Sequence, residues 1–379
     1  MNERNPAAIR AAIKRATTAA QRDMDALDGQ TLEELETLYR QAAADIGAQI
    51  ERQAGGDGKL GLAQLQDLLA QVKGKLAELA QRREALLNDA LPQAAGLGIR
   101  PLTADGVLGA LGASGQAAAF QVGAAVLGSE AAMRISGEAV AFVRAFVAAD
   151  GLRLSDRLWR LDRHARDTLV NAIELAVIQG HGAAEAAREY LARGTAVPAD
   201  VMNKLTAANA AELSKTAQAV MTGKGSPLDN ALRLFRTELN RAHGEAYIHG
   251  ALGHPDAAGV RFLLSPAHPG PDICDLYATQ NLYGLGPGVY PSRAKCPWPA
   301  HPNTLSYVEV VFRDEVGAAD KAGKEKPLEA LARLTPEQRR GVLGKAKNEA
   351  YGEGKITQGM IRSPWRAVRK RLEKRSQAG

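Results

Sequence analysis

Apolar residues between positions 62 and 79 recur at alternating steps of three and four: Leu62, Leu65, Leu69, Val72, Leu76 and Leu79. This spacing places one apolar stripe along an α-helix and is typical of a heptad seam, which is stable only when a second helix covers it. A glycine-rich run at positions 55–58 breaks the helical pattern just before the seam. We therefore expect residues 1–100 to form a helical hairpin or a short coiled coil.

The partner helix is expected before that break, within residues 1–52. The run Thr31-Leu-Glu-Glu34 matches a capping box and predicts that a second helix begins there. Its apolar stripe contains Leu32, Leu35, Leu38, Ala42, Ile46 and Ile50. A loop around Pro92 to Pro101 is expected to close the hairpin.

The composition favours a mainly α fold. Only 4% of the 379 residues are aromatic although 45% are hydrophobic, and much of the apolar content is alanine, a strong helix former. A helical domain is expected over residues 129–253, with a capped helix from Ser155 to Gly180, a short helix from Ala183 to Leu191 and a helix over 228–252. Residues 194–227 between them are expected to be weakly ordered or a linker with a short helix.

Residues 106–129 carry no charge over 24 positions, which is long enough to span a bilayer. Six glycines, two glutamines and two serines make their transfer into lipid unfavourable. We expect a Gly/Ala-rich hinge over residues 101–128 and no membrane partner. The charged N-terminus lacks the apolar core of a signal peptide, and two cysteines are too few for a disulfide framework, which indicates synthesis in the cytoplasm.

The character of the sequence changes at His254. Residues 254–318 hold most of the prolines, both cysteines and two β-branched or aromatic runs, Gly259 to Leu264 and Ser306 to Arg313, that predict strands. We expect a small, turn-rich α+β module near the C-terminus. A capping box at Thr335-Pro-Glu-Gln338 then predicts a last helical unit over residues 327–379.

Four pieces of this region follow one another in a specific order. They are the helix LFRTELNRAHGEAYIHGAL (234–252), then SPAHPGPDICDLYA (265–278), YGLGPGVYP (283–291) and PWPAHPN (297–303). In this order they resemble the phage head morphogenesis family, also called Mu protein F-like or minor head proteins. The helical segment upstream looks like the family as well, so the likeness covers roughly residues 150–330.

The resemblance implies a structural role in a virion and no catalysis. A few copies would bind the portal or the major capsid protein and act in head assembly, DNA packaging or DNA ejection. The motif is carried by Arg236, Thr237, Glu238, Asp272, His301, Pro302 and Asn303. Arg236 and Glu238 are too close along one helix for the favoured i,i+4 ion pair, so we expect Arg236 to bind backbone groups of the Pro/Gly block. A solvated, charged helix face is the alternative.

Many relatives carry a Cys-x-Cys after His-Pro-Asn and a second cysteine near the Asp-x-Cys turn, whereas this chain has Thr304-Leu305-Ser306 and Tyr277 at those places. The donors that remain are Cys274, Cys296 and His301, with His268 or Asp272 as a fourth ligand. This set could hold a structural zinc ion, because thiolates and imidazoles suit a tetrahedral site. The alternative is two buried thiols and a histidine hydrogen-bonded to a turn.

An enzyme is not expected. His243, Glu245 and His249 share one helix, but their spacing matches neither HExxH nor a nuclease pattern. The alternative function is a nucleic-acid-binding protein or a metal-dependent nuclease packaged in the virion.

Positive charge gathers at the C-terminus. The formal net charge of the chain is +6, and the residues from 362 onward carry the same excess, with Glu373 set against Arg362, Arg366, Arg369, Lys370, Arg371, Lys374 and Arg375. Such a tail can neutralise DNA phosphates without reading sequence. An acidic groove on the portal or capsid protein, or a merely solubilising end, would explain it as well. Self-association through the N-terminal helices is a further expectation.

Overall fold

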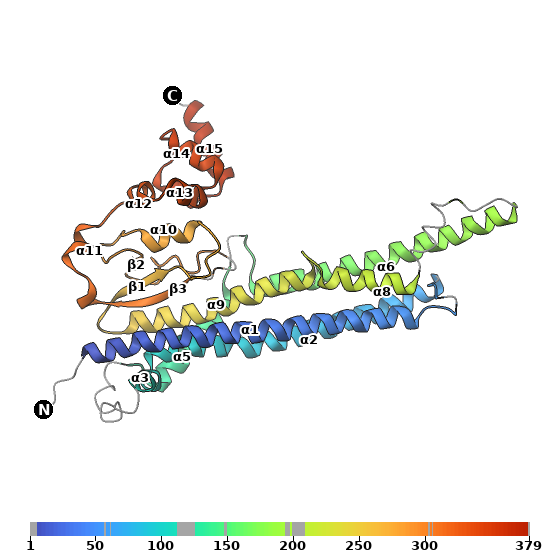
Figure 1. The fold of residues 1–379 in the computed structure, drawn as a ribbon, viewed down its shortest axis with the longest axis horizontal. Coiled ribbons are helices and arrows are strands. Elements are labelled where there is room, and N and C mark those ends of the chain that lie inside the picture. Colours follow the sequence, from blue (N-terminus) through green and yellow to red (C-terminus); the bar gives the residue numbers. More distant parts are fainter. Residues whose placement is uncertain are drawn as a thin grey trace. The chain divides into compact units, whose positions relative to one another are not determined.

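The structure is a computed structural model that describes residues 6–56, 58–60, 62–111, 126–147, 150–193, 198, 209–301, 304 and 306–377. These residues form thirteen α-helices and one three-stranded antiparallel sheet (Figure 1). The expected fold class, mainly α with a small α+β module near the C-terminus, is confirmed.

The chain divides into two compact units, each assembled from separate segments. Unit 1 contains Met1–Met24, Gln93–Val140 and Asn240–Gly379, and unit 2 contains Asp25–Pro92 and Ala141–Leu239. The five ranges expected from the sequence stay a prediction about how the chain is organised.

Most of the N-terminal hairpin lies in unit 2. It is formed by α1 (Pro6–Arg52) and α2 (Leu62–Ile99), of which residues 6–24 and 93–99 belong to unit 1. In this unit the two helices lie side by side (Figure 1), and Lys75 Nζ of α2 is 3.8 Å from Asp45 Oδ2 of α1. The expected stripes are buried over most of their length, with Leu35 and Ile46 of α1 and Val72 of α2 wholly inaccessible to solvent, whereas Leu38 and Leu65 are half-buried. The break at the glycine-rich run is confirmed as the turn between the helices.

Two expected boundaries in this hairpin are wrong. Thr31 does not begin a second helix, because the buried stripe already runs through Ala20 and Met24 and α1 continues without a break. Pro92 does not open a loop, although proline removes a backbone donor and normally ends or kinks a helix. It is exposed inside α2, and Leu91 and Ala95 beside it stay buried, so packing carries the helix on to Ile99.

The rest of unit 2 is built from α6 (Leu154–Ala192), α8 (Ala210–Thr222) and parts of α5 (Ser129–Ala145) and α9 (Pro227–Gly253), and α6 packs against α8. The expected helix end at Gly180 is wrong, since α6 runs through this glycine and includes the segment expected to be a separate short helix. A glycine inside a helix costs only about 1 kcal/mol relative to alanine, which does not end a helix by itself.

Unit 1 contains the sheet, formed by β1 (Ala257–Leu263), β2 (Val289–Tyr290) and β3 (Tyr307–Phe312) in the order β2-β1-β3. Both expected strands, β1 and β3, are confirmed. The two-residue β2 was not expected, because a run so short has no periodicity. Its Tyr290 pairs with Val260 of β1. A Cβ on the neighbouring Gly259 would lie 2.5 Å from the Tyr290 carbonyl oxygen, so only glycine fits at that position.

Several short elements also belong to unit 1. They are the 3-10 turns η1 (Arg100–Leu102) and η3 (Arg313–Glu315) and the helices α3 (Ala104–Leu111), α10 (Ile273–Thr279) and α11 (Ala318–Ala322). The expected hinge over 101–128 falls in part on residues 112–125, which lie outside the described residues. Among the helices that are described, none is long and apolar enough to cross a membrane.

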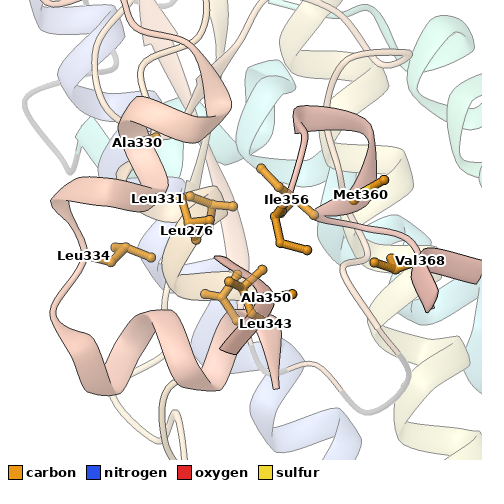
Figure 2. Packing of buried hydrophobic residues seen from close by; sticks show 11 residues of the cluster. Leu276, Ala330, Leu331, Leu334, Leu343, Ala350, Ile356, Met360 and Val368 are labelled. Carbon is orange, nitrogen blue, oxygen red and sulfur yellow. The ribbon is translucent and has the colours of Figure 1, made fainter. Parts of the chain in front are cut away.

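The C-terminal helices of unit 1 are α12 (Pro327–Arg333), α13 (Pro336–Leu343), α14 (Lys345–Gly352) and α15 (Trp365–Gln377), with η4 (Gln358–Met360) between the last two. The expected capping box is confirmed, since the Thr335 hydroxyl accepts from the Gln338 N–H and the Gln338 side chain accepts from the Thr335 N–H. These helices share a core that includes Leu331, Leu343, Met360 and Val368 (Figure 2). We call residues 327–377 the C-terminal helical subdomain.

Candidate functional site

The C-terminal half of α9 is the platform on which the turn-rich module rests. Asn240 Nδ2 donates to the Thr304 carbonyl oxygen at 3.0 Å, and the Tyr247 hydroxyl accepts from the Val310 N–H of β3 at 3.1 Å. Gly244 lies between these two positions, and a Cβ there would be 2.1 Å from Nε1 of Trp298. The helix therefore needs a glycine at this point to let the Trp298 ring pack against its backbone.

A buried ion pair strengthens the same contact. The Glu245 side chain is only 2% exposed and accepts from Arg293 Nε at 2.9 and 2.8 Å and from Nη2 of the same guanidinium at 2.8 Å. His249 Nε2 lies 3.1 Å from Oε1 of this carboxylate, an oxygen that also accepts from Arg293 Nε. Burial alone would raise the pKa of Glu245, but the hydrogen bonds from His249 and Arg293 outweigh it and lower that pKa.

The expectation for Arg236, the first residue of the Arg-Thr-Glu triplet, is wrong. Its Nε donates at 3.1 Å to Asp28 of α1, within unit 2, instead of to backbone groups of the Pro/Gly block. Thr237 donates to the Arg233 carbonyl oxygen one turn earlier, and Glu238 is buried. Arg236 is four residues upstream of Asn240, and that difference of one helical turn places it in the other unit.

The Asp-x-Cys turn is the start of α10. The Asp272 carboxylate accepts from the Cys274 N–H at 2.6 Å, and the Asp275 carboxylate accepts from the Asp272 N–H at 2.8 Å, which completes a capping box. This arrangement satisfies backbone donors that have no partner inside the helix and fixes the direction of all three side chains.

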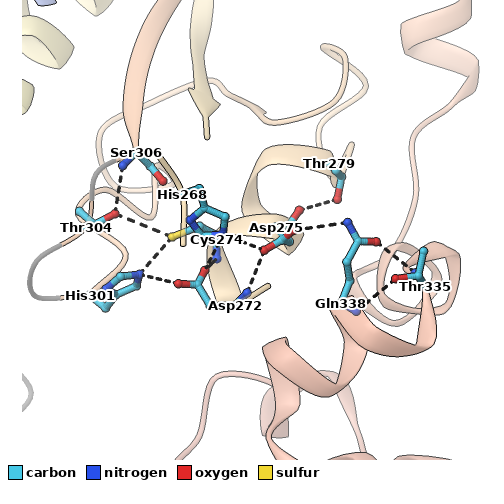
Figure 3. Close-up of polar contacts among 10 residues, drawn as sticks. All are labelled: His268, Asp272, Cys274, Asp275, Thr279, His301, Thr304, Ser306, Thr335 and Gln338. Atoms are coloured by element: carbon cyan, nitrogen blue, oxygen red, sulfur yellow. Dashed lines mark hydrogen bonds and ion pairs between the residues drawn. The ribbon is translucent and has the colours of Figure 1, made fainter. Parts of the chain in front are cut away.

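Three potential metal ligands converge beside this turn (Figure 3). His301 Nε2 lies 3.3 Å from Cys274 Sγ and 3.0 Å from Asp272 Oδ2, and the three donor atoms all lie within 4.8 Å of one another. Cys274 is buried, whereas Asp272 and His301 are partly exposed. Three donors of the types that bind metals thus surround one point, and they could hold a metal ion.

A second set of donors shares Asp272. His268 Nε2 lies 3.1 Å from Asp275 Oδ2 and 3.8 Å from Asp272 Oδ1. The other oxygen of Asp275 accepts from Gln338 Nε2 of α13 at 3.3 Å, which ties the turn to the C-terminal helical subdomain (Figure 3). His268 therefore interacts with the carboxylates around the turn and belongs to a separate group from Cys274.

The expected ligand set needs one correction. Cys296 belongs to neither group of potential ligands among the described residues, although it is buried. Burial raises the pKa of its thiol to about 11, and the Arg293 guanidinium donates to its backbone carbonyl at 3.3 Å. The backbone of Cys296 is thus bound by the same guanidinium that pairs with Glu245. Pro302 and Asn303, also named from the sequence, lie outside the described residues.

The Cys274, His301 and Asp272 contacts do not form a relay of the kind that cysteine hydrolases use. In such a relay the thiol and the carboxylate contact opposite nitrogens of the imidazole, so that one orients the ring while the other gives up its proton. Here both approach the same atom, Nε2. Burial also raises the pKa of the Cys274 thiol to about 11, which disfavours the nucleophilic thiolate.

Sequence reasoning missed the residues that hold the module on its helix. Asn240, Gly244 and Tyr247 lie at steps of four and three on one face of α9, next to the motif triplet. That spacing was visible in the sequence, but their partners Thr304, Trp298 and Val310 lie more than fifty residues downstream. A single sequence does not show such pairings.

Comparisons with protein-family models, with curated proteins and with solved structures found no match for this chain. The likeness to the head morphogenesis family rests on the quoted residues alone.

Proposed function

We propose that this chain is a structural minor head protein of a tailed phage, which acts in capsid assembly, DNA packaging or DNA ejection near the portal. The observation that carries the proposal is the ordered set of motif pieces between residues 234 and 303. Three of these pieces contact one another within unit 1: the Trp298 ring packs against the backbone of α9 at Gly244, and Cys274 of the Asp-x-Cys turn contacts His301. A motif whose parts contact one another is more specific than the same residues scattered over a fold.

A structural role suits the chemistry of this region. Its polar groups are engaged with one another: Glu245 with Arg293 and His249, and Asp275 with His268 and Gln338. Such pairs fix a shape, and among the described residues of this region they leave no activated nucleophile aimed at a substrate. The portal or the major capsid protein is the expected partner, and the virion is the expected location.

Deletion of the gene from its phage, followed by imaging of the particles, tests this role. We expect empty or misassembled heads in place of DNA-filled ones, and a plasmid copy of the gene should restore normal particles. Infectious, DNA-filled heads in the deletion strain would refute an essential assembly role.

The module is further proposed to hold one structural zinc ion through Asp272, Cys274 and His301. Bonds of about 2.0–2.3 Å from a tetrahedral zinc place neighbouring ligand atoms roughly 3.5 Å apart. The separations of 3.3 and 3.0 Å from His301 Nε2 are close to this value. Bound zinc would join the start of α10 to the segment before β3, which lie 27 residues apart at Cys274 and His301.

Elemental analysis of protein purified without chelator should find about one zinc per chain. Cys274→Ser and His301→Ala should each reduce the zinc content to a small fraction, because each removes one of three ligands. Cys296→Ser is the matched control, since it removes the other buried thiol and should leave the zinc in place. A metal-free sample that is as stable as the zinc-loaded protein would contradict the zinc proposal. So would a Cys296→Ser variant that loses as much zinc as the Cys274 and His301 variants.

A further inference from the structure

We propose that the outer face of α15 binds the phosphate backbone of double-stranded DNA without reading its sequence. The inference does not depend on the virion role, because it rests on the charge and packing of one helix in the C-terminal helical subdomain.

The basic segment is a docked helix and not a loose tail. Val368 belongs to the core of the subdomain and is completely buried (Figure 2). Trp365 and Leu372 pack against the same core. These three residues lie at steps of three and four and form the inner face of α15. The core thereby fixes the direction in which the opposite face points, so its cations are presented as a rigid surface.

The outer face carries a stripe of cations. Arg366, Lys370 and Lys374 follow at steps of four, which places them opposite the buried residues and about 6 Å apart along the helix axis. All three are exposed, and no ion pair of the described residues involves them. Unpaired cations at this spacing repel one another, and a bound polyanion reduces that repulsion.

The other basic residues of the segment are more engaged. Arg369 pairs with Glu373 at 3.4 Å, and Arg371 donates to the Gly359 carbonyl oxygen at 3.5 Å. The Arg362 guanidinium lies over the Tyr277 ring, 5.3 Å from its centroid. The stripe formed by Arg366, Lys370 and Lys374 is therefore the part of the basic segment most available to a ligand.

The chemistry of this face favours a nucleic-acid duplex over an acidic protein, a single strand or a lipid surface. Every exposed residue of α15 from Arg366 to Arg375 is charged, whereas protein interfaces carry an apolar or aromatic centre. No aromatic residue lies on this face, and single strands are bound by stacking on aromatic side chains. The apolar side of α15 is already packed against the core, so it is not available to enter a lipid surface.

Binding of the full-length protein to a fluorescent DNA duplex, measured by anisotropy over a range of salt concentrations, tests the proposal. The triple variant Arg366→Gln, Lys370→Gln and Lys374→Gln should bind at least about tenfold more weakly at low salt. Its plot of log K against log salt should be shallower by about 2.7, since each lost phosphate contact removes about 0.9 from the slope. These positions avoid the core, so an unchanged melting temperature will show that the fold is kept.

A variant with the same charge loss on other exposed helix positions is the control. Arg40→Gln, Arg134→Gln and Lys215→Gln also remove three positive charges, from side chains that are exposed. This control should keep the affinity and the slope of the wild type. Equal weakening in both triple variants, unchanged binding in the α15 variant, or tighter binding to an acidic peptide than to the duplex would overturn the proposal.

Discussion

Replacement of Arg293 by alanine should destabilise the protein by about 3–5 kcal/mol, because it leaves the buried Glu245 carboxylate without its main partner. The guanidinium makes three contacts of 2.8–2.9 Å with that carboxylate, whose side chain is 2% exposed. The remaining contact from His249 is one hydrogen bond. Chemical denaturation followed by circular dichroism measures the change in the free energy of unfolding.

The pH dependence makes this prediction specific. Glu245 has a folded pKa below its ordinary value of 4.5, so its pairing stabilises the fold above that pH and the stabilisation is lost as the pH falls through the folded pKa. The difference between wild type and Arg293→Ala should therefore be largest at pH 7 and shrink below about pH 4.5. Adding Glu245→Gln to Arg293→Ala should recover part of the loss, because it removes the unpaired charge. An additive double variant would contradict the buried pair.

The second large effect is expected at Gly98, where α2 crosses α9 within unit 1. A Cβ on this residue would lie 2.1 Å from the His243 carbonyl oxygen and 2.9 Å from its carbonyl carbon. Both are backbone atoms, so only separation of the helices could make room. Gly98→Ala should lower the free energy of unfolding by about 3 kcal/mol, measured by thermal or chemical denaturation.

A second glycine of α2 provides the control. Gly96 has nothing within 4 Å of an added Cβ. Gly96→Ala should raise the stability by about 0.5–1 kcal/mol, because alanine is the better helix former. If both variants lose stability equally, the close approach of the His243 backbone does not explain the loss at Gly98, and the proposed contact with His243 is wrong.

Local sequence patterns predicted the secondary structure well where neighbouring residues alone determine it. The seam from Leu69 to Leu79, the cap at Thr335 and the strand at Tyr307 to Phe312 all depend on neighbouring residues, and all are confirmed. Helix boundaries failed at Thr31 and Pro92, where burial of the continuing stripe outweighs the local signal. Tertiary packing commonly overrides propensity in this way.

The site was predicted in part. Asp272, Cys274 and His301 were named from the motif, and the structure brings them together. Cys296 was grouped with them by residue type alone, but the chain direction after Arg293 takes it to Glu245. Arg236 pairs across more than two hundred residues with Asp28, a contact between segments whose sequences give no hint of each other.

The proposed role is tested most directly by counting this chain in DNA-filled heads purified from lysates of the cells that carry its gene. Quantitative mass spectrometry, with the major capsid protein as the internal standard, gives the number of copies per head. The proposal predicts a few copies in every head. Absence from purified particles, or an abundance equal to that of the major capsid protein, would contradict it.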